Sequence, residues 1–98
     1  GFYIPEKRVS LEDIAQKAGI HPKVIEAIGS ETVSEAEDNE LPSDMAVIAA
    51  KKAIEDAGIN PLNIDIIINS PAGLQDYIIP PISGKVQYEI GAENAVCF

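Results

Sequence analysis

The stretch Leu41-Pro42-Ser43-Asp44-Met45-Ala46 opens the part of the sequence that decides the fold. Ser43 or Asp44 can cap a helix there, and Gly58 can end it. The apolar face predicted for this helix comprises Val47, Ile48, Ala50 and Ile54, whereas Lys51, Lys52 and Glu55 are expected to face water. The next apolar run, Ile64-Asp65-Ile66-Ile67-Ile68-Asn69-Ser70, is typical of a strand buried on both faces of a parallel sheet. A helix followed by such a strand indicates an α/β fold.

The same pattern then repeats towards residue 98. Residues 71–80 form a predicted loop, and Pro81 can open a second helix, which Gly91 ends. One stripe of this helix carries Ile82, Val86 and Ile90. The apolar run Asn94-Ala95-Val96-Cys97-Phe98 predicts another strand. Helices alternating with buried strands favour a layered α/β domain with a short, mostly parallel sheet.

Two shorter helices are predicted before this region. Ser10 with Asp13 forms a capping box, and Gly19 is a natural stop for the helix that follows. Pro22 suits the first position of a second helix, which Gly29 ends. The polar and acidic residues that follow, 30–41, are expected to form an exposed connector.

Composition narrows the classes of function. At 98 residues the chain is expected to form one domain at most. Its net charge of −9 argues against nucleic-acid binding, because phosphate recognition needs clustered Lys and Arg. No apolar run is long enough to cross a bilayer. One cysteine excludes an internal disulfide and fits a reducing cytoplasm.

The order of these elements resembles the N-terminal half of the 3-oxoacyl-acyl-carrier-protein synthase III family. Tyr3-Ile4-Pro5-Glu6 and the loop Gln75-Asp76-Tyr77-Ile78-Ile79-Pro80 add to the resemblance, which is close from Leu41 onward and weak over residues 7–40. It implies a partial thiolase-like layered domain, with helices on an incomplete, mostly parallel sheet. Residues 1–41 would be a variable helical segment with an acidic loop, and residues 42–98 a helix-strand-helix-strand core. A first strand and everything after the third strand would then be missing.

The resemblance also implies an activity for the full-length protein. Enzymes of this family are cytoplasmic acyltransferases that start fatty-acid or polyketide synthesis. They take an acyl primer from acyl-coenzyme A or another acyl thioester and condense it with malonyl-acyl-carrier protein, without a cofactor or metal. In the family the nucleophilic cysteine lies shortly beyond the position of Phe98, and the catalytic His and Asn lie in the C-terminal half. We therefore expect this chain to contain no catalytic residue and to be inactive alone.

Cys97 and His21 are the two side chains that invite a catalytic role. A nucleophilic thiolate needs a helix N-terminus or a nearby His to lower its pKa, and neither stands near Cys97 in the sequence. We expect Cys97 to be a buried strand residue that behaves as a small hydrophobe. His21 is the only histidine and precedes a proline, so a helix-start or solvent position is expected. The acidic residues at 35–40 lack the ligand spacing of a calcium loop.

By resemblance, Ile79 and the last strand are the candidate site residues. The family residue directly before the loop proline often reaches across a dimer and lines the partner's acyl pocket, which makes Ile79 a predicted substrate contact. An apolar residue that only anchors the loop is an equally good interpretation. Family members pair their third strands antiparallel across a two-fold axis. The predicted homodimer interface is therefore Asn94, Ala95, Val96, Cys97 and Phe98.

Two departures from the family keep alternatives open. Where many members carry a Trp and an Arg that contact coenzyme A, this chain has Lys23 and Ala27, so the primer carrier is left open. The sister family, 3-hydroxy-3-methylglutaryl-coenzyme A synthase, has a general-base Glu where this chain reads Asn69-Ser70-Pro71. That alternative therefore ranks second. A non-enzymatic α/β interaction module is the third interpretation, and the coding sequence after Phe98 would separate it from an enzyme.

Overall fold

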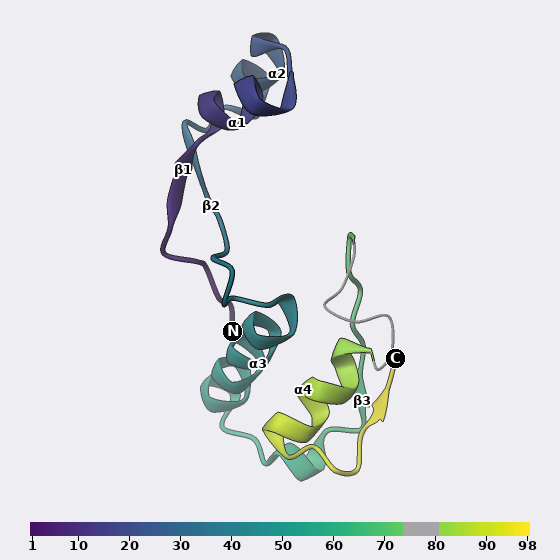
Figure 1. The fold of residues 1–98 in the computed structure, drawn as a ribbon. Helices are drawn as coiled ribbons and strands as arrows, with labels where there is room; N and C mark the ends of the chain where they lie inside the picture. The colour runs from purple at the N-terminus through teal and green to yellow at the C-terminus, as the bar shows by residue number, and fades with distance from the viewer. Residues whose placement is uncertain (74–80) are drawn as a thin grey trace. The chain divides into compact units, whose positions relative to one another are not determined.

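A computed structural model describes residues 1–73 and 81–98 (Figure 1). They form two compact units, one made of residues 4–39 and one, here called the core unit, made of residues 1–3 and 40–98. The elements are β1 (Arg8–Ser10), α1 (Leu11–Ala18), α2 (Pro22–Ile28), β2 (Thr32–Ser34), α3 (Pro42–Ala57), a 3₁₀ helix (Pro61–Asn63), β3 (Ile66–Ile67), α4 (Ile82–Ile90) and β4 (Val96–Cys97). The predicted α/β class is confirmed.

In the 4–39 unit both short helices begin and end where the sequence predicts. The Ser10 hydroxyl accepts a hydrogen bond from the backbone N–H of Asp13, as the capping box requires. At α2, Pro22 takes the first helical position, and His21 Nδ1 accepts from the backbone N–H of Lys23 at 3.2 Å. The predicted helix-start position of His21 is confirmed.

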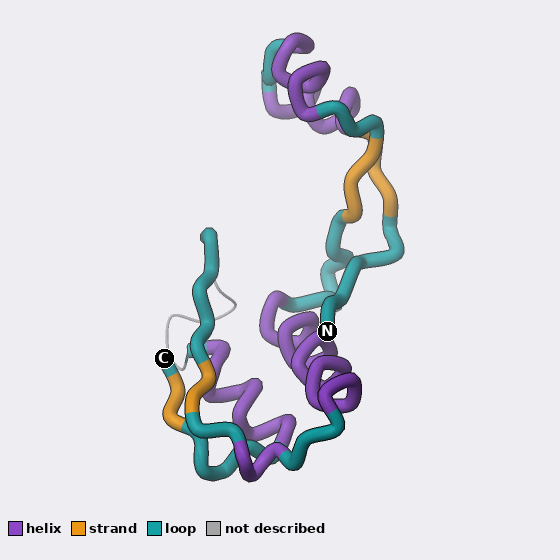
Figure 2. Tube along the Cα trace, turned by 180° about the vertical axis from the view of Figure 1, so that it is seen from behind, coloured by secondary structure: helices purple, strands orange, loops and turns teal. Residues whose placement is uncertain are grey.

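The predicted connector at residues 30–41 is partly wrong, because it contains a strand. Residues 32–34 pair antiparallel with residues 8–10, with Val9 opposite Val33 (strands in Figure 2). The Arg8 guanidinium donates to Ser34 Oγ at 2.9 Å and to Thr32 Oγ1 at 2.8 Å. The run Thr32-Val33 is β-branched, which suits a pleated surface, and this was the available signal for the strand.

An exposed ion pair lies next to the paired residues of this two-stranded sheet. Lys7 Nζ lies 2.5 Å from Glu35 Oε1. This hydrogen bond, and then the charge of the partner, lower the pKa of Glu35 and raise the pKa of Lys7. The pair therefore stabilises the folded state between the ordinary pKa values of the two groups. That stabilisation fades as the pH falls through the lowered pKa of Glu35 or rises through the raised pKa of Lys7.

In the core unit α3 ends as predicted but is capped differently. Gly58 adopts φ +63°, a left-handed conformation that favours glycine, and ends the helix. The predicted cap at Ser43 or Asp44 is wrong: Leu41 is the N-cap residue, without a side-chain bond, and Pro42 opens the helix. Both predicted capping side chains lie within the first turn, and both interact with Lys85 of α4.

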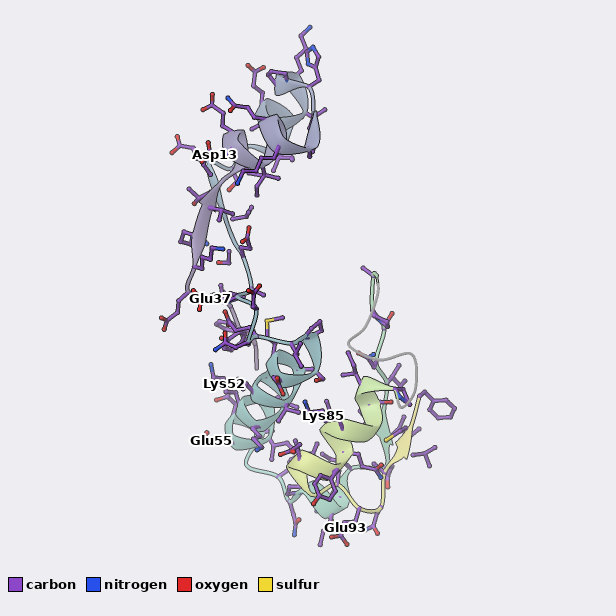
Figure 3. The ribbon with its side chains drawn as sticks, in the orientation of Figure 1. Asp13, Glu37, Lys52, Glu55, Lys85 and Glu93 are labelled. Carbon is purple, nitrogen blue, oxygen red and sulfur yellow. The ribbon has the colours of Figure 1, made fainter. Side chains whose placement is uncertain are left out.

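The hydrophobic core lies where α3 packs beside α4 (Figures 1 and 2). Val47 from α3 meets Ile82 and Val86 from α4, and the partly buried side chains against this cluster are Ala46, Ala50, Ile67 and Ile90. The predicted face of α3 is wrong at Ile48, which is 38% exposed. Figure 3 shows Lys52 and Glu55 on the side of α3 away from α4.

The sheet of the core unit is parallel, as predicted, but shorter than expected. β3 pairs with β4 so that Ile66 lies opposite Val96 and Ile67 opposite Cys97. The prediction of a strand buried on both faces is wrong for the described residues: Ile67 packs on the helices, whereas Ile66 is 56% and Ile68 is 74% exposed. The physical reason is that α3 and α4 cover one face of the sheet only.

The first three residues belong to the core unit and lie along α3. A Cβ atom at Gly1 would clash with the backbone of Ala49 and Ala53, so this close approach to the helix requires glycine. Lys52 Nζ lies 5.9 Å from the centre of the Tyr3 ring, within cation–π range. The Tyr3 hydroxyl donates to a carboxylate oxygen of Glu40. These contacts attach the start of the chain to α3.

The two fully buried serines at the α3–α4 interface generate a stability prediction. Ser83 is 0% exposed, and its hydroxyl has no hydrogen-bond partner among the described residues, whereas the Ser43 hydroxyl accepts from Lys85. Burial of an unpaired hydroxyl is unfavourable, so Ser83→Ala should leave the free energy of unfolding unchanged or raise it by up to about 1 kcal/mol. Ser43→Ala, the matched control, should lower it by about 1–3 kcal/mol. Urea unfolding measures both, and equal losses would contradict the assignment.

Candidate functional site

The Cys97 side chain points from β4 towards α4 and is already engaged. Its Sγ lies 3.1 Å from Gln87 Oε1 and 3.5 Å from the carbonyl oxygen of Ser83. The residue is half-buried. The thiol can donate a hydrogen bond to either of these two acceptor oxygens. Cys97 thus occupies the strand position predicted for it, although it is less buried than expected.

Gln87 connects α4 to the loop that leads into β4. Its Nε2 donates to the carbonyl oxygens of Ala95 at 2.7 Å and Ala92 at 3.2 Å. Both alanines are buried, so these carbonyl groups depend on protein partners for their hydrogen bonds. Gln87 therefore positions the start of β4 and, through its other amide atom, the thiol of Cys97. Sequence reasoning missed this residue, because a glutamine on a helix carries no pattern that indicates a tertiary contact.

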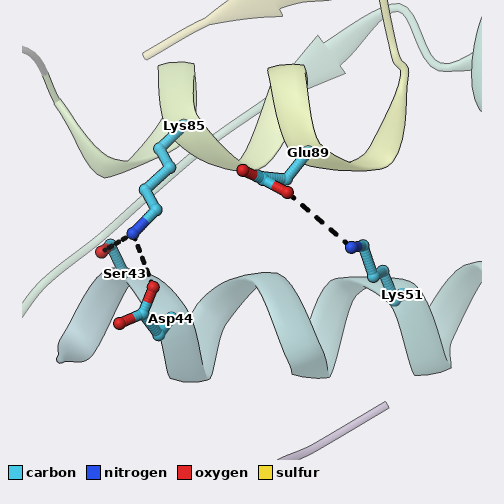
Figure 4. A network of polar contacts seen from close by, with 5 residues as sticks. All are labelled: Ser43, Asp44, Lys51, Lys85 and Glu89. Atoms are coloured by element: carbon cyan, nitrogen blue, oxygen red, sulfur yellow. Dashed lines mark hydrogen bonds and ion pairs between the residues drawn. The ribbon is translucent and has the colours of Figure 1, made fainter. Parts of the chain in front are cut away.

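A polar network joins the first turns of α3 and α4 (Figure 4). Lys85 Nζ donates to Ser43 Oγ at 2.8 Å and to Asp44 Oδ1 at 2.6 Å. A lysine near a helix N-terminus is repelled by the helix dipole, and the Asp44 carboxylate offsets that repulsion. Asp44 is itself favourably placed in the first turn of α3.

A second ion pair lies further along the same helices. Lys51 of α3 and Glu89 of α4 approach to 3.8 Å, with both side chains largely exposed (Figure 4). Such a surface pair contributes little to stability. The ion pairs Lys85–Asp44 and Lys51–Glu89 together show, however, that α3 and α4 run in the same direction.

The outer edge of β4 carries no further strand among the described residues. The backbone N–H of Val96 donates to Asp65, and that of Phe98 to Ile67, both on the β3 side. Because backbone groups alternate along a parallel strand, the N–H and C=O of Cys97 point to the opposite edge. This edge is the one predicted to form the homodimer, and that role stays a prediction.

Ile79, the predicted substrate contact, lies in the segment 74–80, outside the described residues. Its role also stays a prediction. The Lys23 and Ala27 positions are described, and both side chains are exposed on α2.

A groove between α1 and α2 includes residues adjacent in sequence to these positions. It has a volume of about 370 Å³ and is lined by Glu12, Ala15, Gln16, Ile20, Pro22, Ile25 and Glu26. Its charged lining residues are both acidic. An adenine nucleotide carries phosphates, which would be repelled by Glu12 and Glu26. This groove is therefore poorly suited to hold the nucleotide part of coenzyme A.

The described residues offer no metal site or membrane span. No three His, Cys, Asp or Glu side chains in residues 1–73 and 81–98 are grouped so that they could hold a metal ion. No helix within those ranges is both long and apolar enough to cross a membrane.

Comparison with known proteins adds a family to this geometry. No protein-family model matches the chain. Beta-ketoacyl-[acyl-carrier-protein] synthase III of Clostridium acetobutylicum is 37% identical over 98 residues, which are 100% of this chain and 30% of that protein. The protein of the same name from Neisseria meningitidis serogroup A is 38% identical over 95 residues, or 96% of this chain and 29% of that protein.

A solved structure agrees with these relatives. The priming beta-ketosynthase from the R1128 polyketide biosynthetic pathway matches with a TM-score of 0.83 and 31% identity, over 100% of this chain and 29% of that one. The chain thus spans about three tenths of the length of each of these three proteins. It belongs to the beta-ketoacyl-[acyl-carrier-protein] synthase III-like condensing enzymes of the thiolase fold, of which it represents an N-terminal part.

Proposed function

We propose that the full-length protein is an acyltransferase that starts fatty-acid or polyketide chains by a decarboxylative Claisen condensation. The observation that carries this proposal is the 37% identity to a synthase III along the whole of this chain. The acyl primer arrives as a thioester and is transferred to an enzyme cysteine, which releases the carrier thiol. Malonyl-acyl-carrier protein then loses carbon dioxide, and the resulting carbanion equivalent attacks the acyl carbon of the acyl-enzyme. The bond from that carbon to the cysteine sulfur breaks, the cysteine leaves as a thiolate, and the 3-oxoacyl thioester is formed on the carrier protein.

Within that reaction, residues 1–98 supply scaffold and no catalytic group. Two observations support this division. Cys97 Sγ faces Gln87 on the helix-covered side of the sheet, and His21, the only histidine, accepts a hydrogen bond at the start of α2. The nucleophile and its partners would then come from the part of the enzyme outside this sequence.

The second interpretation, a 3-hydroxy-3-methylglutaryl-coenzyme A synthase, stays behind the first. Asn69, Ser70 and Pro71 follow β3, and none of them is a carboxylate that could act as a general base. Similarly, the acidic groove between α1 and α2 supports a primer carrier that does not place its phosphates there. To identify the primer carrier, the activity of the full-length enzyme would be compared between acyl thioesters of coenzyme A and acyl thioesters of carrier protein.

Acylation of the full-length enzyme tests the assignment of Cys97. With acyl-coenzyme A or acyl-carrier protein, we expect one acyl group per subunit, located by peptide mass mapping outside residues 1–98. The control variant Cys97→Ser should keep the adduct and hold kcat/KM within about threefold of wild type, since no transition-state contact is removed. An acyl group mapped to Cys97, or loss of the adduct in Cys97→Ser, would show that this residue is catalytic. A protein that forms no 3-oxoacyl product from any primer would refute the proposed reaction.

We further propose a homodimer through the free edge of β4, residues 94–98. Cys97→Pro removes an N–H that points to this edge and leaves the bonds of Val96 and Phe98 to β3 in place. Sedimentation of the full-length enzyme across a dilution series should give a dimer for wild type and a dissociation constant raised at least about tenfold for the variant, a cost of about 1.4 kcal/mol. Circular dichroism checks that the variant is folded. Wild-type monomer at micromolar concentration, or an equally tight variant dimer, contradicts this interface.

Ile79 is proposed to limit the acyl pocket of the partner subunit in that dimer. Ile79→Phe adds bulk, and should shift primer preference of the full-length enzyme towards shorter acyl chains by about tenfold in the ratio of kcat/KM values, the effect expected of about one to two methylene groups. Ile79→Leu conserves volume and serves as the control. Unchanged chain-length selectivity in Ile79→Phe would leave Ile79 as a loop anchor only.

A further inference from the structure

Gln87 on α4 uses its whole side-chain amide to hold the segment that leads into β4. Its Nε2 donates to the carbonyl oxygens of Ala95 and Ala92, and its Oε1 lies 3.1 Å from Cys97 Sγ. A carbonyl oxygen can only accept, so the atom that faces Ala92 and Ala95 must be the amide nitrogen, and the amide oxygen is left for the thiol. Both hydrogens of the amide nitrogen therefore hold the backbone of this segment.

The backbone of Gln87 holds the same segment. Its carbonyl oxygen accepts the N–H of Ala92 at 3.0 Å, directly after Gly91 ends α4. Ala92 is 0% and Ala95 is 8% exposed, so water has little access to take the place of the amide at their carbonyl groups. Loss of the amide would leave buried acceptors without this donor, which is unfavourable, and the segment would have to move to pair them again.

The contacts of β4 with β3 do not replace those with Gln87. Strand β4 comprises two residues, Val96–Cys97, and its backbone bonds run in the plane of the sheet, such as that from the Phe98 N–H to the Ile67 carbonyl oxygen at 2.9 Å. Bonds in this plane fix the register of β4 along β3, but they leave the distance between β4 and α4 open. The directional contacts of Gln87 fix that distance.

We propose that Gln87 is a positioning residue for acyl transfer: it holds the start of β4 on α4 and thereby places the nucleophilic cysteine of the full-length enzyme. This inference rests on the proposed function, in which the nucleophile follows shortly after the position of Phe98. A shift at Ala95 would then be carried along β4 to that cysteine. Reacting atoms must approach to about 3–3.5 Å, and a misplacement of about 1 Å slows a reaction on the order of 100-fold. Gln87 acts through the backbone and touches no substrate.

Single-turnover acylation of the full-length enzyme by acyl-coenzyme A or acyl-carrier protein tests the proposal. Gln87→Ala should lower the maximal rate constant of acylation at least about tenfold, whereas the primer concentration that gives half of this rate should stay within about threefold of wild type. Gln87→Met fills the same space without the amide and should divide its effect in the same way. Circular dichroism checks that each variant is folded.

Val47→Ala is the matched control for general stability. It removes buried apolar volume from the contact between α3 and α4, and it leaves the hydrogen bonds of Gln87 in place. Its urea midpoint should fall, because the substitution creates a cavity. Its maximal rate constant of acylation should nevertheless stay within about threefold of wild type, since no contact that positions β4 on Gln87 is lost.

The outcomes separate this inference from the proposed reaction. Folded Gln87→Ala or Gln87→Met enzyme that is acylated as fast as wild type would overturn the inference and leave the reaction standing. An equal loss of rate in Val47→Ala would also overturn it, because the effect would then be one of general stability. If neither Gln87 variant folds, Gln87 is required for the fold and its proposed role in placement is refuted. Wild-type enzyme that forms no acyl-enzyme would refute the proposed reaction, and this inference with it.

Discussion

The packing of α3 against α4 is the contact on which the core unit depends. Val47 meets Ile82 and Val86 there, and Ile67 carries β3 onto the same cluster. Two of the positions between the helices are serines with no more than 1% exposure, Ser43 and Ser83. Small side chains at these positions let the first turns of the helices lie close together. Because the helices run in the same direction, β3 can be followed by α4 and then by a parallel strand, β4, on the same side.

Polar contacts specify this arrangement more than they stabilise it. Lys85 interacts with Ser43 and Asp44, which sets the register of one helix on the other, although partly exposed ion pairs contribute little net free energy.

The two sides of the β3–β4 sheet differ in what covers them. One side of the sheet is covered by α3 and α4, and there the half-buried thiol of Cys97 lies beside Gln87. The other side is open and apolar, and the edge of β4 is unpaired among the described residues. The 4–39 unit is different in character. Among its described residues only Leu11 and Ala15 are buried apolar side chains, and its α1–α2 groove has an acidic rim.

Local chemistry was sufficient for much of the secondary structure. The Ser10 capping box, Pro22 at a helix start, and Gly58 and Gly91 at helix ends each act through a few neighbouring backbone groups, so their outcome was predictable from the sequence. The spacing of Ile82, Val86 and Ile90 likewise predicted the buried stripe of α4. The alternation of helices with apolar runs predicted the α/β class and a mostly parallel sheet, and the family resemblance agreed; the structure and the comparisons confirm both.

Tertiary structure alone decided which of these signals were overridden. Ser43 and Asp44 have good capping side chains, yet both serve Lys85, a partner 41 or 42 residues away in sequence. The strand at residues 32–34 exists because residues 8–10 offer it a partner, and no local pattern reports that pairing. Similarly, the isoleucines at residues 66–68 predict burial on both faces of the strand, but burial depends on which layers are present to cover those faces. Periodicity records which side chains can be buried, and long-range packing determines which of them are.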